Sequence, residues 1–138
     1  MFLCTGNSCR SQMAEGFARD LGKGLLEPYS AGLAPSKVNP YAIKIMQELG
    51  IDISRQTSKA IDVQLLQQMD IIITLCGHAE DMCPMTPPGI KRIHWPIDDP
   101  VKSIGTEEEI LNEFRKTRDE IKTRINEFIE NLWKERNR

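Results

Sequence analysis

A thiol nucleophile, a Gly/Asn turn and an arginine stand together near the start of the chain, in the segment Cys4-Thr5-Gly6-Asn7-Ser8-Cys9-Arg10. In a loop of this kind, backbone N–H groups can point inward and form a concave site for an anion. The guanidinium of Arg10 offers a planar fork of donors to two oxygens of a tetrahedral oxyanion. A helix that begins directly after the loop adds partial positive charge, which also favours the thiolate form of Cys4. These features predict that Cys4 attacks a bound oxyanion, as in phosphatase chemistry.

The predicted oxyanion site comprises the residues that follow the nucleophile: Thr5, Gly6, Asn7, Ser8, Cys9, Arg10 and Ser11. Gly6 and Asn7 are the residues best suited to the left-handed backbone of such a turn. Ser11 is placed to hydrogen-bond the thiolate. The spacing Cys-x5-Arg alone also fits a buried cysteine in a tight turn, with a surface arginine. The predicted strand before the loop and the helix after it favour the oxyanion site.

A second pair of cysteines, Cys76 and Cys83, has the spacing Cys-x6-Cys. One interpretation is structural, because cysteines are commonly buried. Another is a zinc site that adds His78 and also His94, although this spacing is poor for a closed zinc centre. The third is a redox pair on a flexible segment. An activated Cys4 nearby favours the redox pair, since a dithiol indicates that the product of its attack leaves by reduction.

Two acidic residues, Asp98 and Asp99, precede Pro100 in a predicted loop. Solvated turn aspartates are one interpretation of this pair. If the loop lies over the oxyanion site, one of them can protonate the leaving oxygen as a general acid. The two histidines have no predicted role in catalysis: we expect His94 to pack in its strand and His78 to lie in a loop.

The bulk composition describes an ordinary globular chain, with 138 residues, 40% hydrophobic and 28% charged, and a net charge of −2. We expect one domain, residues 1–138. The charge balance argues against nucleic-acid binding, and no apolar run approaches the ~20 residues that span a bilayer. The N-terminus lacks the pattern of a signal peptide, so we expect a cytoplasmic protein in a reducing compartment. There the four cysteines should be catalytic, metal-binding or buried rather than paired in a static disulfide framework.

The elements that must position these residues alternate between strands and helices, which predicts an α/β fold with a parallel sheet. We expect strands at 1–3, 28–31, 71–75 and 92–95, and helices at 11–21, 40–50 and 62–69. A capping box at Thr106 and Glu109 opens a last, long helix. Its apolar stripe is core packing: Ile110, Phe114, Ile121, Ile125, Phe128 and Leu132.

Cys4, Cys76 and the Asp98–Asp99 pair each follow a predicted strand. In an open parallel sheet, ligands bind beyond the carboxyl ends of the strands. Neighbouring strands lie ~4.8 Å apart, so loops that leave adjacent strands can meet over one pocket. The map therefore predicts that these residues come together.

The chain resembles the thioredoxin-coupled arsenate reductases, a family that shares the fold of low-molecular-weight tyrosine phosphatases. The resemblance covers essentially the whole chain. The later cysteine pair, Cys76 and Cys83, is the feature that separates the reductases from the phosphatases. It is carried by Cys-Thr-Gly-Asn-Ser-Cys-Arg-Ser-Gln-Met-Ala-Glu-Gly at 4–16, Tyr-Ser-Ala-Gly at 29–32, Gly-Ile-Asp-Ile-Ser at 50–54, Thr-Leu-Cys-Gly at 74–77, Cys-Pro-Met-Thr-Pro-Pro at 83–88 and Asp-Asp-Pro at 98–100.

The resemblance implies a single-domain three-layer sandwich, in which a four-stranded parallel sheet of order 2-1-3-4 has helices on both faces. It implies that Cys4 attacks arsenate held by the loop and Arg10, with Asp99 as general acid. Cys76 then attacks Cys4, which releases arsenite, and Cys83 resolves the Cys4–Cys76 disulfide into Cys76–Cys83. Thioredoxin is the implied reductant. No bound cofactor, no metal and a monomeric state are expected, and Cys9 has no required role.

Two positions depart from the family pattern. The chain begins three residues before Cys4, where the family has a longer first strand, so the start is truncated or the strand is short. The family's potassium site uses positions that match Asn7, Glu15 and Ser30, with an Asp after Thr-Ser. Here the residue after Thr-Ser is Lys59. We expect its ammonium to supply the charge of the ion, or alternatively to point into solvent.

Two other functions remain compatible with these residues. Cys4, Arg10 and Asp99 would suffice for a low-molecular-weight tyrosine phosphatase. Such phosphatases carry aromatic residues beside the substrate, whereas this chain has Val101 and Lys102 after Asp-Pro. The non-enzymatic alternative is a redox- or metal-sensing module built from Cys76, His78 and Cys83.

Overall fold

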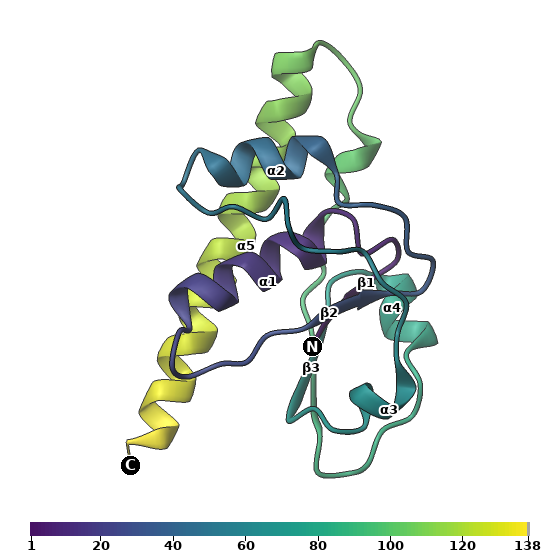
Figure 1. Cartoon of the computed structure of the whole chain (residues 1–138), viewed down its shortest axis with the longest axis vertical. Coiled ribbons are helices and arrows are strands. Elements are labelled where there is room, and N and C mark those ends of the chain that lie inside the picture. The colour runs from purple at the N-terminus through teal and green to yellow at the C-terminus, as the bar shows by residue number, and fades with distance from the viewer. Residues whose placement is uncertain (138) are drawn as a thin grey trace.

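Four short parallel strands form the centre of the molecule (Figure 1). The structure is a computed structural model and describes residues 1–137. The strands are β1 (Phe2–Cys4), β2 (Ser30–Gly32), β3 (Ile71–Thr74) and β4 (Lys91–His94). They lie in the order β2-β1-β3-β4, and every pair is parallel. The predicted sheet and its strand order are confirmed.

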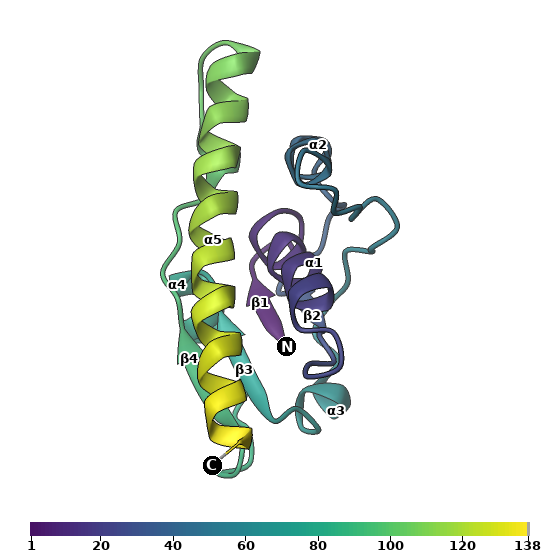
Figure 2. The same ribbon diagram turned by 90° about the vertical axis from the view of Figure 1, so that its left-hand side faces the viewer.

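Helices cover both faces of this sheet, because successive side chains of a strand point to opposite faces. Phe2, Cys4 and Ile73 pack on the side of α1 (Arg10–Leu21), α2 (Pro40–Gln47) and α5 (Glu107–Arg136). Leu3 and Ile72 pack on the side of α3 (Val63–Leu66) and α4 (Gly77–Met82). The three-layer arrangement is therefore confirmed. Figure 2 shows α5 running along the whole height of the molecule.

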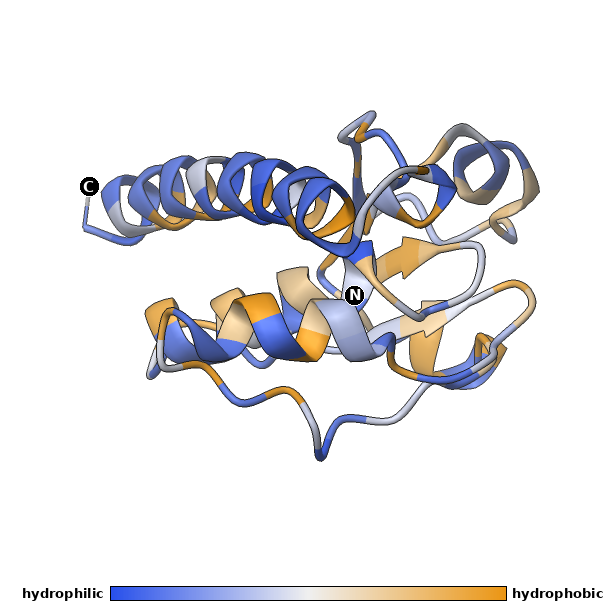
Figure 3. Ribbon diagram, turned by 90° about the horizontal axis from the view of Figure 1, so that it is seen from above, coloured by the Kyte–Doolittle hydropathy of each residue, from blue (hydrophilic) through white to orange (hydrophobic). Residues whose placement is uncertain are grey.

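The long helix α5 presents its apolar side to α1, as the hydropathy colours in Figure 3 show. Phe114, Ile121 and Ile125 of the predicted stripe are buried. The capping box is present: the Thr106 hydroxyl accepts from the N–H of Glu109, whose carboxylate accepts from the N–H of Thr106. Among the described residues, no helix combines the length and apolar character needed to cross a bilayer.

Several element boundaries differ from the predicted ones. Helix α2 begins after Asn39, whose side chain accepts from the N–H of Tyr41, but it ends three residues before Gly50. Strand β2 starts at Ser30 rather than at residue 28, and α3 is shorter than predicted. The 3-10 turn η1 (Pro100–Lys102) was not predicted.

Both histidine expectations were wrong. His78 lies in α4 and not in a loop. Gly77 had suggested a loop here, but the Cys76 cap and the buried Ala79 stabilise a short helix. His94 is exposed at the end of β4 rather than packed within the sheet. Its ring nitrogen Nδ1 lies 2.9 Å from the hydroxyl of Thr74.

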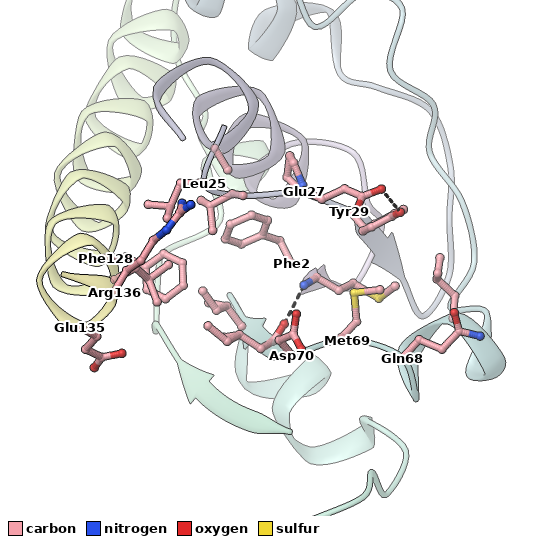
Figure 4. A pocket seen from close by; sticks show the side chains of 18 residues that line it. Phe2, Leu25, Glu27, Tyr29, Gln68, Met69, Asp70, Phe128, Glu135 and Arg136 are labelled. Carbon is pink, nitrogen blue, oxygen red and sulfur yellow. Dashed lines mark hydrogen bonds between the residues drawn. The ribbon is translucent and has the colours of Figure 1, made fainter. Parts of the chain in front are cut away.

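A cavity of about 650 Å³ lies at the amino ends of the strands, on the opposite edge of the sheet from the Cys4 loop (Figure 4). Its lining includes Phe2, Ile71 and Phe128, and none of the predicted site residues. The terminal amine of Met1 donates to the carbonyl of Ile71 at 2.8 Å, and burial lowers the pKa of this amine to about 6. This cavity is separate from the loop that follows Cys4.

Candidate active site

Cys4 ends strand β1 and is buried, with 3% of its surface exposed. Its Sγ lies 2.9 Å from the Oγ of Ser11, in the first turn of α1. The side-chain amide of Asn7 donates to that same Oγ at 2.8 Å. Because Ser11 accepts from Asn7, its own hydrogen is free to point at the sulfur. The hydroxyl of Ser11 is therefore placed to donate to the sulfur of Cys4.

The carbonyls of the loop point outward, where protein donors satisfy them. The N–H groups of Ala34 and Asn39 donate to the carbonyls of Thr5 and Ser8, at 2.8 and 2.9 Å. Those of Gly6 and Asn7 accept from the hydroxyl of Ser58 and the amide of Gln12, each at 2.9 Å. Within residues 1–137, no acceptor takes the N–H groups of residues 6–9. Such unpaired, converging N–H groups form an anion-binding concavity.

The left-handed position of the loop is Asn7, with φ 46°, and not Gly6. The prediction that both residues adopt this conformation was wrong for Gly6. The loop also requires a glycine at position 32 of β2, because a Cβ there would lie 2.7 Å from the N atom of Asn7 and from the carbonyl oxygen of Thr5. Only a glycine at the end of β2 lets the loop pass this closely.

Arg10 and Asp99 lie together at the mouth of the loop. The guanidinium Nη1 of Arg10 donates to the carbonyl of Ile97 at 2.8 Å, and Nη2 lies 3.6 Å from a carboxylate oxygen of Asp99. The other carboxylate oxygen of Asp99 accepts from the N–H of Val101. Asp98 is exposed. The geometry thus brings Asp99, and not its neighbour, to the oxyanion site.

Cys76 reaches the same site from the next strand. Its Sγ lies 3.4 Å from the Oγ1 of Thr5, 71 residues away in the sequence, because β1 and β3 pair in the sheet. Cys76 also caps α4 by accepting from the N–H of Ala79. Cys83 stands at the other end of α4. The structure therefore places one of the later thiols at the loop and keeps the other a helix length away.

The thiols differ in their electrostatic surroundings. Burial raises the pKa of Cys9, which is 4% exposed, so this thiol stays protonated at neutral pH. Burial also raises the pKa of Cys83, and the nearby guanidinium of Arg92 partly opposes that effect. All four cysteines are free thiols.

Lys59 extends into the cluster behind the loop. Its Nζ lies 3.7 Å from a carboxylate oxygen of Glu15 and 3.4 Å from the Oγ of Ser30, and it donates to the carbonyl of Thr57 at 2.7 Å. Ser30 in turn donates to Glu15 and accepts from Asn7. The ammonium thus contacts two of the three residues that were expected to surround a cation, and its side chain is still 42% exposed.

In the described part of the chain, no three His, Cys, Asp or Glu side chains are grouped so that they could hold a metal ion. Sequence reasoning missed the carbonyl of Ile97, which orients Arg10, and the close approach of Gly32. A glycine directly after a strand was the available signal for the second. No local pattern could have indicated the first.

Comparisons with known proteins show the family of the chain. The family described as low molecular weight phosphotyrosine protein phosphatase matches residues 1–138. An arsenate reductase of Halalkalibacterium halodurans is 56% identical over 129 residues, which cover 94% of this chain and 93% of the relative.

Among solved structures, an arsenate reductase in a phosphate-binding state has 40% identity and a TM-score of 0.77, over 96% of each chain. A thioredoxin-dependent arsenate reductase of Corynebacterium glutamicum has 28% identity and a TM-score of 0.74, over 96% of this chain and 60% of that chain. Two curated relatives, at 56% and 55% identity, are named arsenate reductase, and the chain belongs to the low molecular weight phosphotyrosine protein phosphatase family.

Proposed function

We propose that the protein reduces arsenate to arsenite, with Cys4 as nucleophile and Cys76 and Cys83 as a disulfide relay that thioredoxin regenerates. The observation that carries the proposal is the contact between Cys76 and Thr5, 3.4 Å from sulfur to oxygen, at the rim of the loop that Cys4 opens. A phosphatase needs no second thiol there. The names of relatives with more than half of their residues identical support the same substrate.

The first step forms a bond between the Cys4 sulfur and arsenic and breaks one arsenic–oxygen bond. The inward N–H groups and Arg10 hold the tetrahedral oxyanion, so the charge of the transition state meets donors already in place. Asp99 donates a proton to the oxygen that leaves as water. Ser11 is placed to donate to the attacking sulfur through its 2.9 Å contact.

The second step is attack by the Cys76 thiolate on the Cys4 sulfur. A sulfur–sulfur bond forms, the sulfur–arsenic bond breaks, and its electron pair stays on arsenic, which leaves as arsenite. In the third step the Cys83 thiolate attacks Cys76, which forms the Cys76–Cys83 disulfide and returns Cys4 as a thiolate. A thioredoxin dithiol then reduces that disulfide and is itself oxidised. The relative named thioredoxin-dependent supports this choice of reductant.

The third step requires α4 to open. Cys76 and Cys83 flank the six residues of this helix. At a rise of about 1.5 Å per residue, their Cα atoms stand roughly 10 Å apart. A disulfide needs a Cα separation of about 7 Å or less. Formation of the Cys76–Cys83 disulfide therefore requires α4 to unwind, and this unwinding brings the new disulfide to the surface.

The direct test measures arsenate-dependent oxidation of NADPH with thioredoxin and thioredoxin reductase added. We expect turnover by the wild-type protein and none by Cys4→Ser. Purified wild-type protein that consumes NADPH no faster with arsenate than without it would contradict the proposal. We also propose that the protein acts in a reducing cytoplasm, which suits its four free thiols, and that it acts as a monomer.

Phosphate-monoester hydrolysis is the second candidate, because it uses the same three groups: a cysteine nucleophile, an arginine and an acid. Nη2 of Arg10 lies 3.6 Å from a carboxylate oxygen of Asp99. Cys76→Ser separates the two: it should abolish arsenate turnover and leave hydrolysis of para-nitrophenyl phosphate intact.

We also propose that Lys59 supplies, beside Glu15 and Ser30, the positive charge that a potassium ion would otherwise bring. The 3.7 Å contact between Lys59 and Glu15 supports this role.

A further inference from the structure

Helix α4 has few attachments to the rest of the fold. Of its six residues, all of which the structure describes, Ala79 alone is buried. The helix is too short to be stable in isolation, since helices below about 12 residues are marginal in water. Its persistence must therefore depend on specific contacts with the sheet.

One carboxylate supplies such a contact. A carboxylate oxygen of Glu80 accepts from the hydroxyl of Thr74 at 2.5 Å, and Thr74 is 1% exposed at the end of β3. The same hydroxyl lies 2.9 Å from Nδ1 of His94, at the end of β4. Because the single hydroxyl hydrogen of Thr74 goes to Glu80, Nδ1 of His94 is the donor to Thr74. The three side chains thus form a chain of hydrogen bonds that ties α4 to β3 and β4.

We propose that Glu80 is a positioning residue of the Cys76–Cys83 pair: by tying α4 to Thr74 and His94 it stabilises the helical, reduced form and so makes the disulfide easier to reduce. The disulfide cannot form until α4 unwinds, and unwinding breaks the bond between Glu80 and Thr74. An interaction present only in the dithiol form shifts the redox equilibrium toward that form.

This inference rests on the disulfide chemistry proposed above, but its test uses neither arsenate nor thioredoxin. The protein is equilibrated with mixtures of oxidised and reduced dithiothreitol in a Cys4→Ser background. The fraction of Cys76–Cys83 disulfide is then measured by peptide mass spectrometry. In this exchange the two protein thiols are oxidised as the reagent disulfide is reduced.

Glu80→Gln keeps the size and helix propensity of the side chain but removes its charge. We expect it to shift the equilibrium constant toward the protein disulfide by roughly three- to tenfold, because the amide oxygen can still accept from Thr74 but a hydrogen bond to a neutral acceptor is weaker than one to a carboxylate. A tenfold shift is about 30 mV. Thr74→Val removes the donor and should act in the same direction. The double variant should shift the equilibrium no further than the larger single effect, because both changes act on the same contact.

Asp81→Asn is the matched control, because Asp81 carries the same charge on the same helix and is exposed. It should leave the equilibrium within twofold of wild type. An equal shift in Asp81→Asn would assign the effect to net charge and overturn the proposal. So would a Glu80→Gln equilibrium that matches the wild-type value.

Hydrogen exchange of the reduced protein gives an independent readout. Glu80→Gln should speed exchange of the amides in 79–83 several-fold and leave those of α1 unchanged. If the wild-type protein forms no Cys76–Cys83 disulfide at all, the relay of the proposed function fails. The exchange measurement then still decides whether Glu80 holds α4: unchanged amides in 79–83 would refute it.

Discussion

The hydroxyl of Ser11 lies 2.9 Å from the sulfur of Cys4 and accepts a hydrogen bond from Asn7, which leaves its own hydrogen available to the sulfur. Asn7 is itself held by Ser30. The thiolate is thus supported by a chain of buried side chains that crosses from α1 to β2. Contacts to an ionised group are worth about 1.5–3 kcal/mol.

Ser11→Ala should therefore slow alkylation of Cys4 by iodoacetamide at pH 7 about tenfold, because the thiolate loses its one side-chain donor. Peptide mass spectrometry follows the reaction, with Cys76 as the internal reference in the same sample. Ser54→Ala, an exposed serine outside the loop, is the control variant. Equal Cys4 rates in Ser11→Ala and wild type would remove Ser11 from the activation of the nucleophile.

Arg10→Lys should lower kcat/KM for arsenate on the order of 100-fold, the usual effect of removing an aligned donor to a developing oxyanion. A point ammonium reaches neither the carbonyl of Ile97 nor two oxygens of the substrate in one plane. The measurement is steady-state NADPH oxidation. Arg124→Lys, on α5 and outside the loop, controls for loss of a guanidinium, and near wild-type activity in Arg10→Lys would exclude bidentate binding.

Cys83→Ser should complete one round of arsenite release and then stop with a Cys4–Cys76 disulfide. The contact between Cys76 and Thr5 makes Cys76 the thiol that reaches Cys4 first, whereas Cys83 is a helix length away. Quantifying arsenite after a single turnover and mapping disulfides by mass spectrometry tests this order. A Cys83→Ser protein that releases arsenite without any Cys4–Cys76 link contradicts the relay.

Wild-type activity should not change when potassium replaces sodium at constant ionic strength, because the ammonium of Lys59 already stands 3.7 Å from Glu15. A cation about 4 Å from that ammonium would be repelled by ~4 kcal/mol at an effective dielectric of 20. Lys59→Asp should create potassium activation. Lys37→Asp, a substitution of an exposed lysine, should not, and a potassium-activated wild-type enzyme would refute the role of Lys59.

Glu48 links α2 to α5 through Arg115 and Arg118, and its hydrogen bond with Arg115 is the main reason that its pKa is lowered from 4.5 to about 2. A lowered folded-state pKa adds stability above about pH 4.5, and that stability disappears as the pH falls through about 2.

Glu48→Gln should therefore lower the free energy of unfolding by about 1 kcal/mol at pH 7, a value reduced for the partial exposure of the side chain. Urea unfolding from pH 7 to 2 should show the two proteins converging as the pH falls. Glu113→Gln, an exposed carboxylate on α5, is the control. A difference between Glu48→Gln and wild type that stays constant over this range would exclude ionisation as its cause.

Features that depend only on neighbouring residues were predictable from the amino-acid sequence. The Asn39 cap, the Thr106–Glu109 capping box and the apolar run of β3 formed as predicted, because hydrogen bonds within one turn and burial of a continuous apolar run need no distant partner. The Cys4 loop between a strand and a helix was predictable for the same reason.

The contacts between side chains that are distant in the sequence depend on how the strands pair in the folded protein. The pairing of β1 with β3 brings Cys76 to Thr5, and the carbonyl of Ile97 and the carboxylate of Asp99 hold Arg10 in place. None of these contacts has a local signature. They arise because parallel strands align their carboxyl ends at one edge of the sheet.

The helical conformation of α4 also depends on contacts with the assembled sheet. Six residues with one buried side chain carry a weak local preference, so the sequence pattern favoured a loop. The carboxylate of Glu80 finds Thr74 and His94 only after β3 and β4 have paired. A short helix forms when tertiary contacts offset the entropy of ordering it, and those contacts exist only in the assembled sheet.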